Sequence, residues 1–307
     1  MDAYLVMNTN LPDFQKGNFM TIRISSLLLL FCIFYQVTYS QTSNQSPSSN
    51  DISGFPWAHN SRPYIEGSYG LNQPRHKRFE GDFTRLGVGE ARLGYSKIVP
   101  FRKLLVDIEE LYVFGSYYSK DMDQFAGEEL STKTNLEMTR FGIGNRLGYG
   151  YRLWILGVLL FNEVQGELTK VEYDSLPTLT ASDIEILDRY AGSYRLGIST
   201  AGGVNLQLFK SLSAIVSYEA SVVYPRLVFF PWLGGLIVQT FIVGGVSRFA
   251  EDIVGSSPVL GPIMYAVLRN AVAYGVYLGM RESQYWPIKS ETPLTHETLK
   301  LGVSFTF

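Results

Sequence analysis

The chain has 307 residues, a formal net charge of −2 and only 18% charged residues, so charge gives no case for a nucleic-acid partner. Aromatic residues make up 14% of the chain, with 20 Tyr beside 29 Gly. This mix suits strands that face lipid better than it suits a water-soluble α/β enzyme. The length exceeds that of a minimal barrel, so we expect extra elements or long loops.

Residues 20–40 have the pattern of a secretory signal peptide. Arg23 gives one positive charge, an apolar run of about a dozen residues follows at 24–35, and small or polar residues lead to Ser40. We expect export and cleavage near Ser40. An uncleaved membrane anchor is the alternative, although the apolar run is shorter than the ~20 residues that a spanning helix needs.

The segments on either side of this signal show no domain pattern. Residues 1–19 fit neither a signal nor a fold, so we expect Met20 to be the true start and the first segment a spurious extension. Residues 41–62 are rich in Ser, Asn and Pro and are predicted to be a disordered periplasmic lead. Cys32, the only cysteine, would leave with the signal, and Phe31 before it argues against a lipoprotein signal, which needs a small residue there.

From residue 64 onward, apolar and polar residues alternate in a series of segments, as they do in membrane strands. The predicted strands are 64–71, 79–95, 104–118, 140–151, 156–169, 189–199, 212–222 and 299–307. In the clearest one, Phe141, Ile143 and Leu147 share one face, and Arg140 and Arg146 share the other. The charged residues predicted to face inward are Glu90, Arg92, Arg140, Arg146, Glu163, Glu167, Arg189, Arg195 and Glu219.

The connections alternate in length. Short turns are predicted near 97–103, 150–152 and 209–211. Longer polar stretches lie between them, at 72–78, 119–134 and 174–187. This alternation is typical of an all-β, antiparallel, up-and-down transmembrane barrel, and the count of eight strands allows the sheet to close without an unpaired edge.

One insertion, at about 229–280, departs from the simple barrel. It holds two long apolar stretches, 229–247 and 258–280, which predict an apolar helical insertion before the last strand. We expect this hairpin to pack on or into the barrel. A hairpin held in the inner membrane is one alternative; another is that 236–246 and 271–278 are strands, which would make ten.

The last nine residues alternate without a break and end on an aromatic residue. One face carries Leu299, Leu301, Val303, Phe305 and Phe307. This ending resembles the terminal strand of bacterial outer-membrane β-barrel proteins, in which the closing aromatic residue is the recognition signal for the assembly machinery. The resemblance is to the class as a whole. It implies a bacterial outer-membrane location, with outer-membrane lipid and the barrel assembly machinery as partners.

The sequence offers few candidate catalytic or metal-binding residues. The three histidines, His59, His76 and His296, have no metal-ligand spacing, and we expect them to be solvated surface residues. The best candidate residues for acyl-transfer catalysis are His296 with Glu297, or His76 with a distant serine. Neither pair has a nucleophile motif beside it in the sequence. We therefore predict no catalytic residue, no metal and no cofactor.

Three functions remain open. The first is a structural or binding barrel with a salt-bridged interior, which would fill a lumen of eight strands. The second is a narrow channel or transporter for a small solute, gated by the apolar hairpin. The third is a lipid-acting outer-membrane enzyme. The basic segment 75–78 is a candidate contact for lipopolysaccharide.

Overall fold

The computed structural model describes most of the chain from Ser61 onward. The described residues are 61–100, 104–124, 133–153, 156–174, 179–226, 234, 237, 242, 244–246, 249, 252–257, 259–282 and 291–307. The predicted extension, the signal peptide and nearly all of the predicted lead therefore lie outside the described residues. The first strand begins at Arg62, where that lead was predicted to end.

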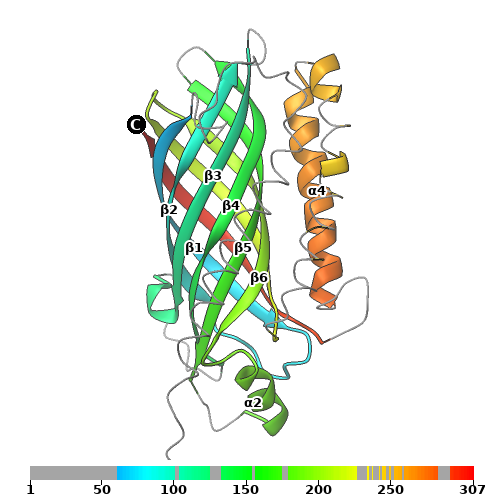
Figure 1. Cartoon of the computed structure of the whole chain (residues 1–307). Coiled ribbons are helices and arrows are strands. Elements are labelled where there is room, and N and C mark those ends of the chain that lie inside the picture. The colour runs from blue at the N-terminus through cyan, green and yellow to red at the C-terminus, as the bar shows by residue number, and fades with distance from the viewer. Residues whose placement is uncertain are drawn as a thin grey trace, which may run out of the picture. The chain divides into compact units, whose positions relative to one another are not determined.

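Eight strands form a closed antiparallel barrel (Figure 1). They are β1 (Arg62–His76), β2 (Leu86–Pro100), β3 (Leu105–Ser119), β4 (Leu136–Leu153), β5 (Leu156–Tyr173), β6 (Tyr194–Gln207), β7 (Leu212–Val223) and β8 (Leu294–Thr306). Each strand pairs with its neighbour in sequence, and β8 closes the ring on β1. The prediction of an eight-stranded, up-and-down barrel is confirmed.

The two ends of the barrel differ. The short connections from β2 to β3, β4 to β5 and β6 to β7 meet at one end, together with the start of β1 and the end of β8. We call this the turn end and the opposite one the loop end. The short 3-10 helix η1 (Lys120–Met122) and the helix α2 (Ala181–Asp188) lie in loop-end connections. The side chain of Thr180 caps α2 by accepting a hydrogen bond from the backbone N–H of Asp183 at 3.1 Å.

Side chains alternate between the two surfaces of the wall, as period two requires. On β8, Leu299, Leu301 and Val303 are more than half exposed on the outer surface, whereas Lys300 between them is 1% exposed and faces the lumen. Other strands expose similar outer residues, such as Leu93 and Val113. The barrel is therefore apolar outside and charged inside.

The insertion between β7 and β8 contains the helix α4 (Gly261–Glu282). This helix includes 271–278, so the ten-strand alternative is wrong. The described residues among 234–256 are also helical, while the rest of the first apolar stretch lies outside the described residues. Among the described residues, no helix has both the length and the mean hydropathy to span a membrane.

α4 packs on the outer surface of the barrel beside β4, β5, β6 and β7 (Figure 1). The ring of Tyr265 meets that of Tyr149 on β4, with centroids 4.7 Å apart. At the other end of the helix, Tyr277 donates a hydrogen bond to Glu297 on β8. Of the two predicted positions, on the barrel or in it, α4 takes the first.

Candidate functional site

Ten charged side chains converge in the middle of the lumen. They are Glu66, Glu90, Arg92, Glu110, Arg140, Arg146, Glu163, Glu167, Glu219 and Lys300. All are at most 5% exposed. They reach the same space because each occupies an inward position of its strand. We call this group the central ion network.

Arg146 on β4 is the hub of one half of the network. Its Nη1 lies 2.6 Å from an oxygen of Glu110 and 3.0 Å from one of Glu66, and its Nε lies 2.5 Å from Glu163. Arg92 reaches the same Glu163 oxygen at 2.9 Å. One carboxylate on β5 is therefore shared by guanidinium groups from β4 and β2.

Arg140 is the hub of the other half. Its Nη1 lies 2.6 Å from Glu219 on β7 and 3.0 Å from Glu167 on β5, and its Nη2 lies 3.1 Å from Glu90 on β2. Lys300 on β8 contacts Glu219 at 2.7 Å and Glu90 at 3.0 Å. Glu90 also accepts from Arg92, which joins the two halves.

Neutral donors complete the network, because it holds six carboxylates and four cations. Ser96 donates to Glu110 at 2.8 Å, and Ser221 donates to Glu167 at 2.6 Å. Tyr112 donates to Glu163 at 3.0 Å, and its ring lies under the guanidinium of Arg92. Buried charges need this degree of compensation to be tolerated.

Gly144 on β4 makes room for Tyr112. A Cβ added at this glycine would meet the Tyr112 ring at 2.5 Å. The absence of a side chain therefore allows an inward tyrosine to lie against the neighbouring strand and still reach Glu163. Gly142 on the same face makes similar room for Phe114, whose Cε1 would lie 2.9 Å from an added Cβ.

The structure brings together seven of the nine charged residues that the sequence predicts to face inward, and Arg189 and Arg195 are the two exceptions. Arg189 is the C-cap of α2 and pairs with Glu185 on the surface, so the prediction of an inward strand position for it is wrong. The error arises because 181–188 folds as a helix and β6 begins only at Tyr194. Arg195 has an inward position in β6, but it lies near the loop end and is half-buried.

Sequence reasoning missed Glu66, Glu110 and Lys300. Lys300 was identifiable, since it is the one charged residue on the face of the terminal strand opposite Leu299 and Leu301. Glu66 and Glu110 were obscured because Tyr64 and Tyr112 also point inward, which breaks the simple rule that apolar residues face out.

Neither described histidine is a fully solvated surface residue, contrary to the prediction. His296 is 1% exposed inside the barrel, where its Nδ1 lies 2.9 Å from the amide nitrogen of Asn72. His76 is half-buried and its Nε2 lies 3.1 Å from the carbonyl oxygen of Thr292. Glu297 points to the outer surface, away from His296, so these neighbours cannot act together. His59 lies outside the described residues.

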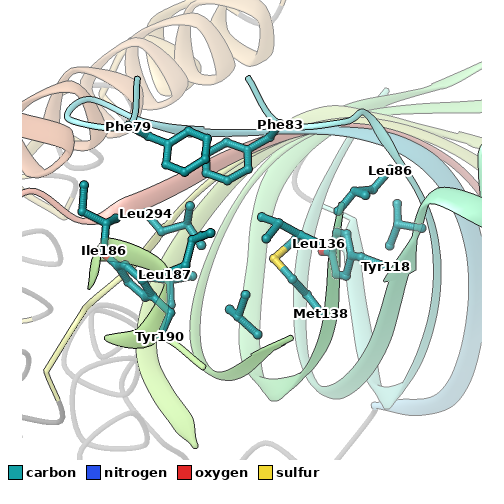
Figure 2. Close-up of a cluster of buried hydrophobic side chains, with 13 residues drawn as sticks. Phe79, Phe83, Leu86, Tyr118, Leu136, Met138, Ile186, Leu187, Tyr190 and Leu294 are labelled. Carbon is teal, nitrogen blue, oxygen red and sulfur yellow. The ribbon is translucent and has the colours of Figure 1, made fainter. Parts of the chain in front are cut away.

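An apolar cluster fills the lumen at the loop end (Figure 2). It consists of Phe79, Phe83, Leu86, Val88, Tyr118, Leu136, Met138, Val171, Ile186, Leu187, Tyr190, Val223 and Leu294. The rings of Phe79 and Phe83 stack with centroids 4.3 Å apart. Because α2 contributes Ile186 and Leu187, this loop-end plug combines barrel strands with residues from two loops.

The lumen at the turn end is hollow. A cavity of about 860 Å³ is lined by inward residues including Ser96, Asn205 and Ser304, and Glu110 of the central ion network also contributes to its wall. Arg62 and Lys210 stand among the residues at its turn-end side. Along its axis the lumen therefore passes from a polar cavity through the network to the loop-end plug.

No protein-family model matches the chain, and no curated protein matches it. Among solved structures, the chain is similar to Neisserial surface protein A, with 8% identity, 80% of this chain and 97% of that chain covered, and a TM-score of 0.38. It is also similar to Ail, the attachment invasion locus protein of Yersinia pestis, with 9% identity, 81% of this chain and 99% of that chain covered, and a TM-score of 0.32. The fold assignment rests on the strand pairing of this chain itself.

Proposed function

We propose that the chain is a bacterial outer-membrane β-barrel with a closed lumen, serving as a structural or binding barrel rather than as a channel. The observation that carries this proposal is the filling of the lumen. The central ion network joins strands across its middle, and the loop-end plug occupies one end. An eight-stranded barrel has an interior just wide enough for side chains to fill it.

The outer surface supports the membrane location. Strands of 12 to 18 residues exceed the 9–11 residues that a tilted strand needs to cross the hydrocarbon layer. Closure of the sheet satisfies the backbone groups that lipid cannot. The terminal strand presents Leu299, Leu301, Val303 and Phe305 outward, with Phe307 after them, and these residues are our candidate signal for the barrel assembly machinery.

The loop end is the proposed cell-surface side. In this orientation Arg75, Lys77 and Arg78 are exposed at the surface level, where the phosphates of lipopolysaccharide would lie. Lys77 already pairs with Glu282, which leaves Arg75 and Arg78 as the stronger candidates for this contact.

The structure favours neither alternative function. α4 lies on the outer wall, so it is not positioned to gate the lumen. An enzyme would need a nucleophile beside an oriented base. Among the described residues, His296 is enclosed with Asn72 and the ring of Tyr118, and the carboxylate beside it in sequence faces the other way.

The first test is localisation and assembly. Membrane fractionation should recover the protein with the outer membrane, in a form whose gel migration changes on boiling, as expected for a stable barrel. Amino-terminal sequencing of the same material should give a start just after Ser40. Recovery with the inner membrane, or migration unaffected by boiling, would overturn the proposal.

The second test is conductance. Purified protein in a planar bilayer should give no current at any applied voltage, while a general porin in the same membrane gives open-channel steps. Reproducible unitary currents from the purified protein would instead establish the channel alternative.

A further inference from the structure

The apolar and polar faces of the helix α4 are arranged in the opposite way to those of a surface helix on a water-soluble protein. The face turned away from the barrel carries Ile263, Met264, Val267, Ala271, Tyr274, Gly275 and Leu278, and charged residues appear only in the last turn of the helix, at Arg281 and Glu282. Val267 is 56% exposed and Ile263 is 44% exposed. A surface helix in water presents charged and polar residues on that side.

The polar residues in the middle of α4, Arg269 and Asn270, face the barrel instead. Arg269 is 4% exposed and donates from Nε to Oδ1 of Asn162 at 3.1 Å, and from Nη1 to the hydroxyl of Tyr265 at 2.5 Å. Asn270 donates to the carbonyl oxygen of Phe161 and accepts from Asn162 at 2.8 Å. The charge of Arg269, in the middle of the helix, is thus enclosed between the helix and the wall.

The barrel wall is shaped for this contact. Asn162 lies at an outward position of β5, is 1% exposed, and also contacts Thr200 on β6. Next to it, a Cβ added at Gly202 would meet Oδ1 of Asn270 at 2.3 Å. Polar residues and a glycine thus occupy wall positions that elsewhere carry lipid-facing apolar side chains, and they fit only a wall that the helix covers.

α4 extends from one end of the barrel to the other. Near its start, the hydroxyl of Tyr151 at the turn end of β4 donates to the carbonyl oxygen of Val259 at 2.5 Å. Near its finish, Met280 contacts Tyr224, which follows β7 at the loop end. At about 1.5 Å per residue its 22 residues cover roughly 33 Å, close to the ~30 Å of a hydrocarbon core.

We propose that α4 lies inside the outer membrane against the outer wall of the barrel, with its apolar face in contact with lipid acyl chains. The inference rests on the proposed membrane location of the barrel. The exposed face of the helix continues the apolar belt of the neighbouring strand, because Tyr274 contacts Tyr218, an outward residue of β7. The wall supplies the hydrogen bonds that lipid cannot give to Arg269 and Asn270.

A fluorescence experiment with matched positions tests this placement. In a Cys32→Ser background, single cysteines are introduced at Ala271 on the outer face of α4, at Ala273 on its buried face, at Val113 on the outward face of β3 and at Asp121 in a loop. Each is labelled with a small fluorophore in the purified full-length barrel, which is then reconstituted in phosphatidylcholine vesicles with brominated acyl chains. Heat-modifiable migration is checked for every variant.

The label at Ala271→Cys should lose fluorescence to the brominated lipid as the label at Val113→Cys does, and should resist aqueous iodide. The label at Ala273→Cys should respond less to the lipid quencher, and the label at Asp121→Cys should respond to iodide alone. Quenching of Ala271→Cys by iodide alone, with Val113→Cys still quenched by lipid, overturns the inference and leaves the membrane barrel intact. Failure of the lipid quencher at Val113→Cys overturns the proposed membrane location and the inference with it.

Discussion

Arg140 on β4 and Glu219 on β7 meet inside the barrel with 2.6 Å between Nη1 and Oε1, although two strands separate β4 from β7 around the wall. Backbone hydrogen bonds join only neighbouring strands, so ion pairs of this kind add a second set of connections across the lumen. Arg140 alone contacts carboxylates from three other strands. Because each guanidinium group pairs with several buried carboxylates, we expect substitution of these arginines to lower the stability of the barrel more than other substitutions in its interior.

Replacing Arg140 with glutamine should destabilise the barrel by about 3–5 kcal/mol, because three buried carboxylates lose their shared partner. The measurement is urea-induced unfolding in lipid vesicles, followed by fluorescence. Arg195→Gln is the matched control, since Arg195 is half-buried near the loop end and its Nε has no hydrogen-bond partner among the described residues. Equal losses in the two variants would contradict a special role for the network.

Replacing Asn162 with leucine should loosen α4 and leave the barrel closed. The change removes the acceptor for Arg269 and a donor to Asn270, a cost of about 1–3 kcal/mol for buried groups left without partners. Hydrogen exchange should rise in α4 and stay unchanged in β1, β2 and β3. Unchanged exchange in α4 would show that apolar contacts alone hold the helix.

Substitution of Gly202 by alanine should act on the same contact by steric means. The new Cβ would fall 2.3 Å from Oδ1 of Asn270, so either the helix or this side chain must move, at about 1–3 kcal/mol. Gly67→Ala is the control, because a Cβ there meets nothing within 4 Å. Protease sensitivity of the α4 segment should increase in the first variant only.

Phe307→Ala should reduce the amount of assembled barrel in cells if the aromatic ending is the assembly signal. Phe209→Ala is a suitable comparison, since Phe209 lies at the same end of the barrel with similar exposure, 63% against 67%. Heat-modifiable protein in isolated outer membranes is quantified for both. Equal yields would remove the assembly role of Phe307 while leaving the fold unaffected.

Period-two alternation predicted the barrel because each strand has one face toward lipid and one toward the lumen. It failed where the lumen itself holds aromatic residues, as at Tyr64 and Tyr112 beside Glu66 and Glu110. It also failed at Arg189, where a capped helix replaces the predicted start of β6. Alternation reports which side of a strand is apolar, and it does not distinguish a lipid-facing ring from one that packs on a guanidinium.

The position of α4 was beyond sequence reasoning for a different reason. Its apolar stretch predicted a helix, but the choice between the lumen and the outer wall depends on partners from distant strands. Asn162 and Gly202 are ordinary polar and small residues in the sequence, and only their proximity to Asn270 reveals a contact surface. The same holds for His296, whose burial follows from its inward position near the plug.

Lys300 links closure of the ring to charge compensation inside it. It lies on β8, which pairs with both β7 and β1, and it contacts Glu219 on β7 and Glu90 on β2. Without β8, the network would hold six carboxylates with three guanidinium groups. The strand that completes the backbone hydrogen bonds of the ring therefore also supplies the fourth cation of the interior.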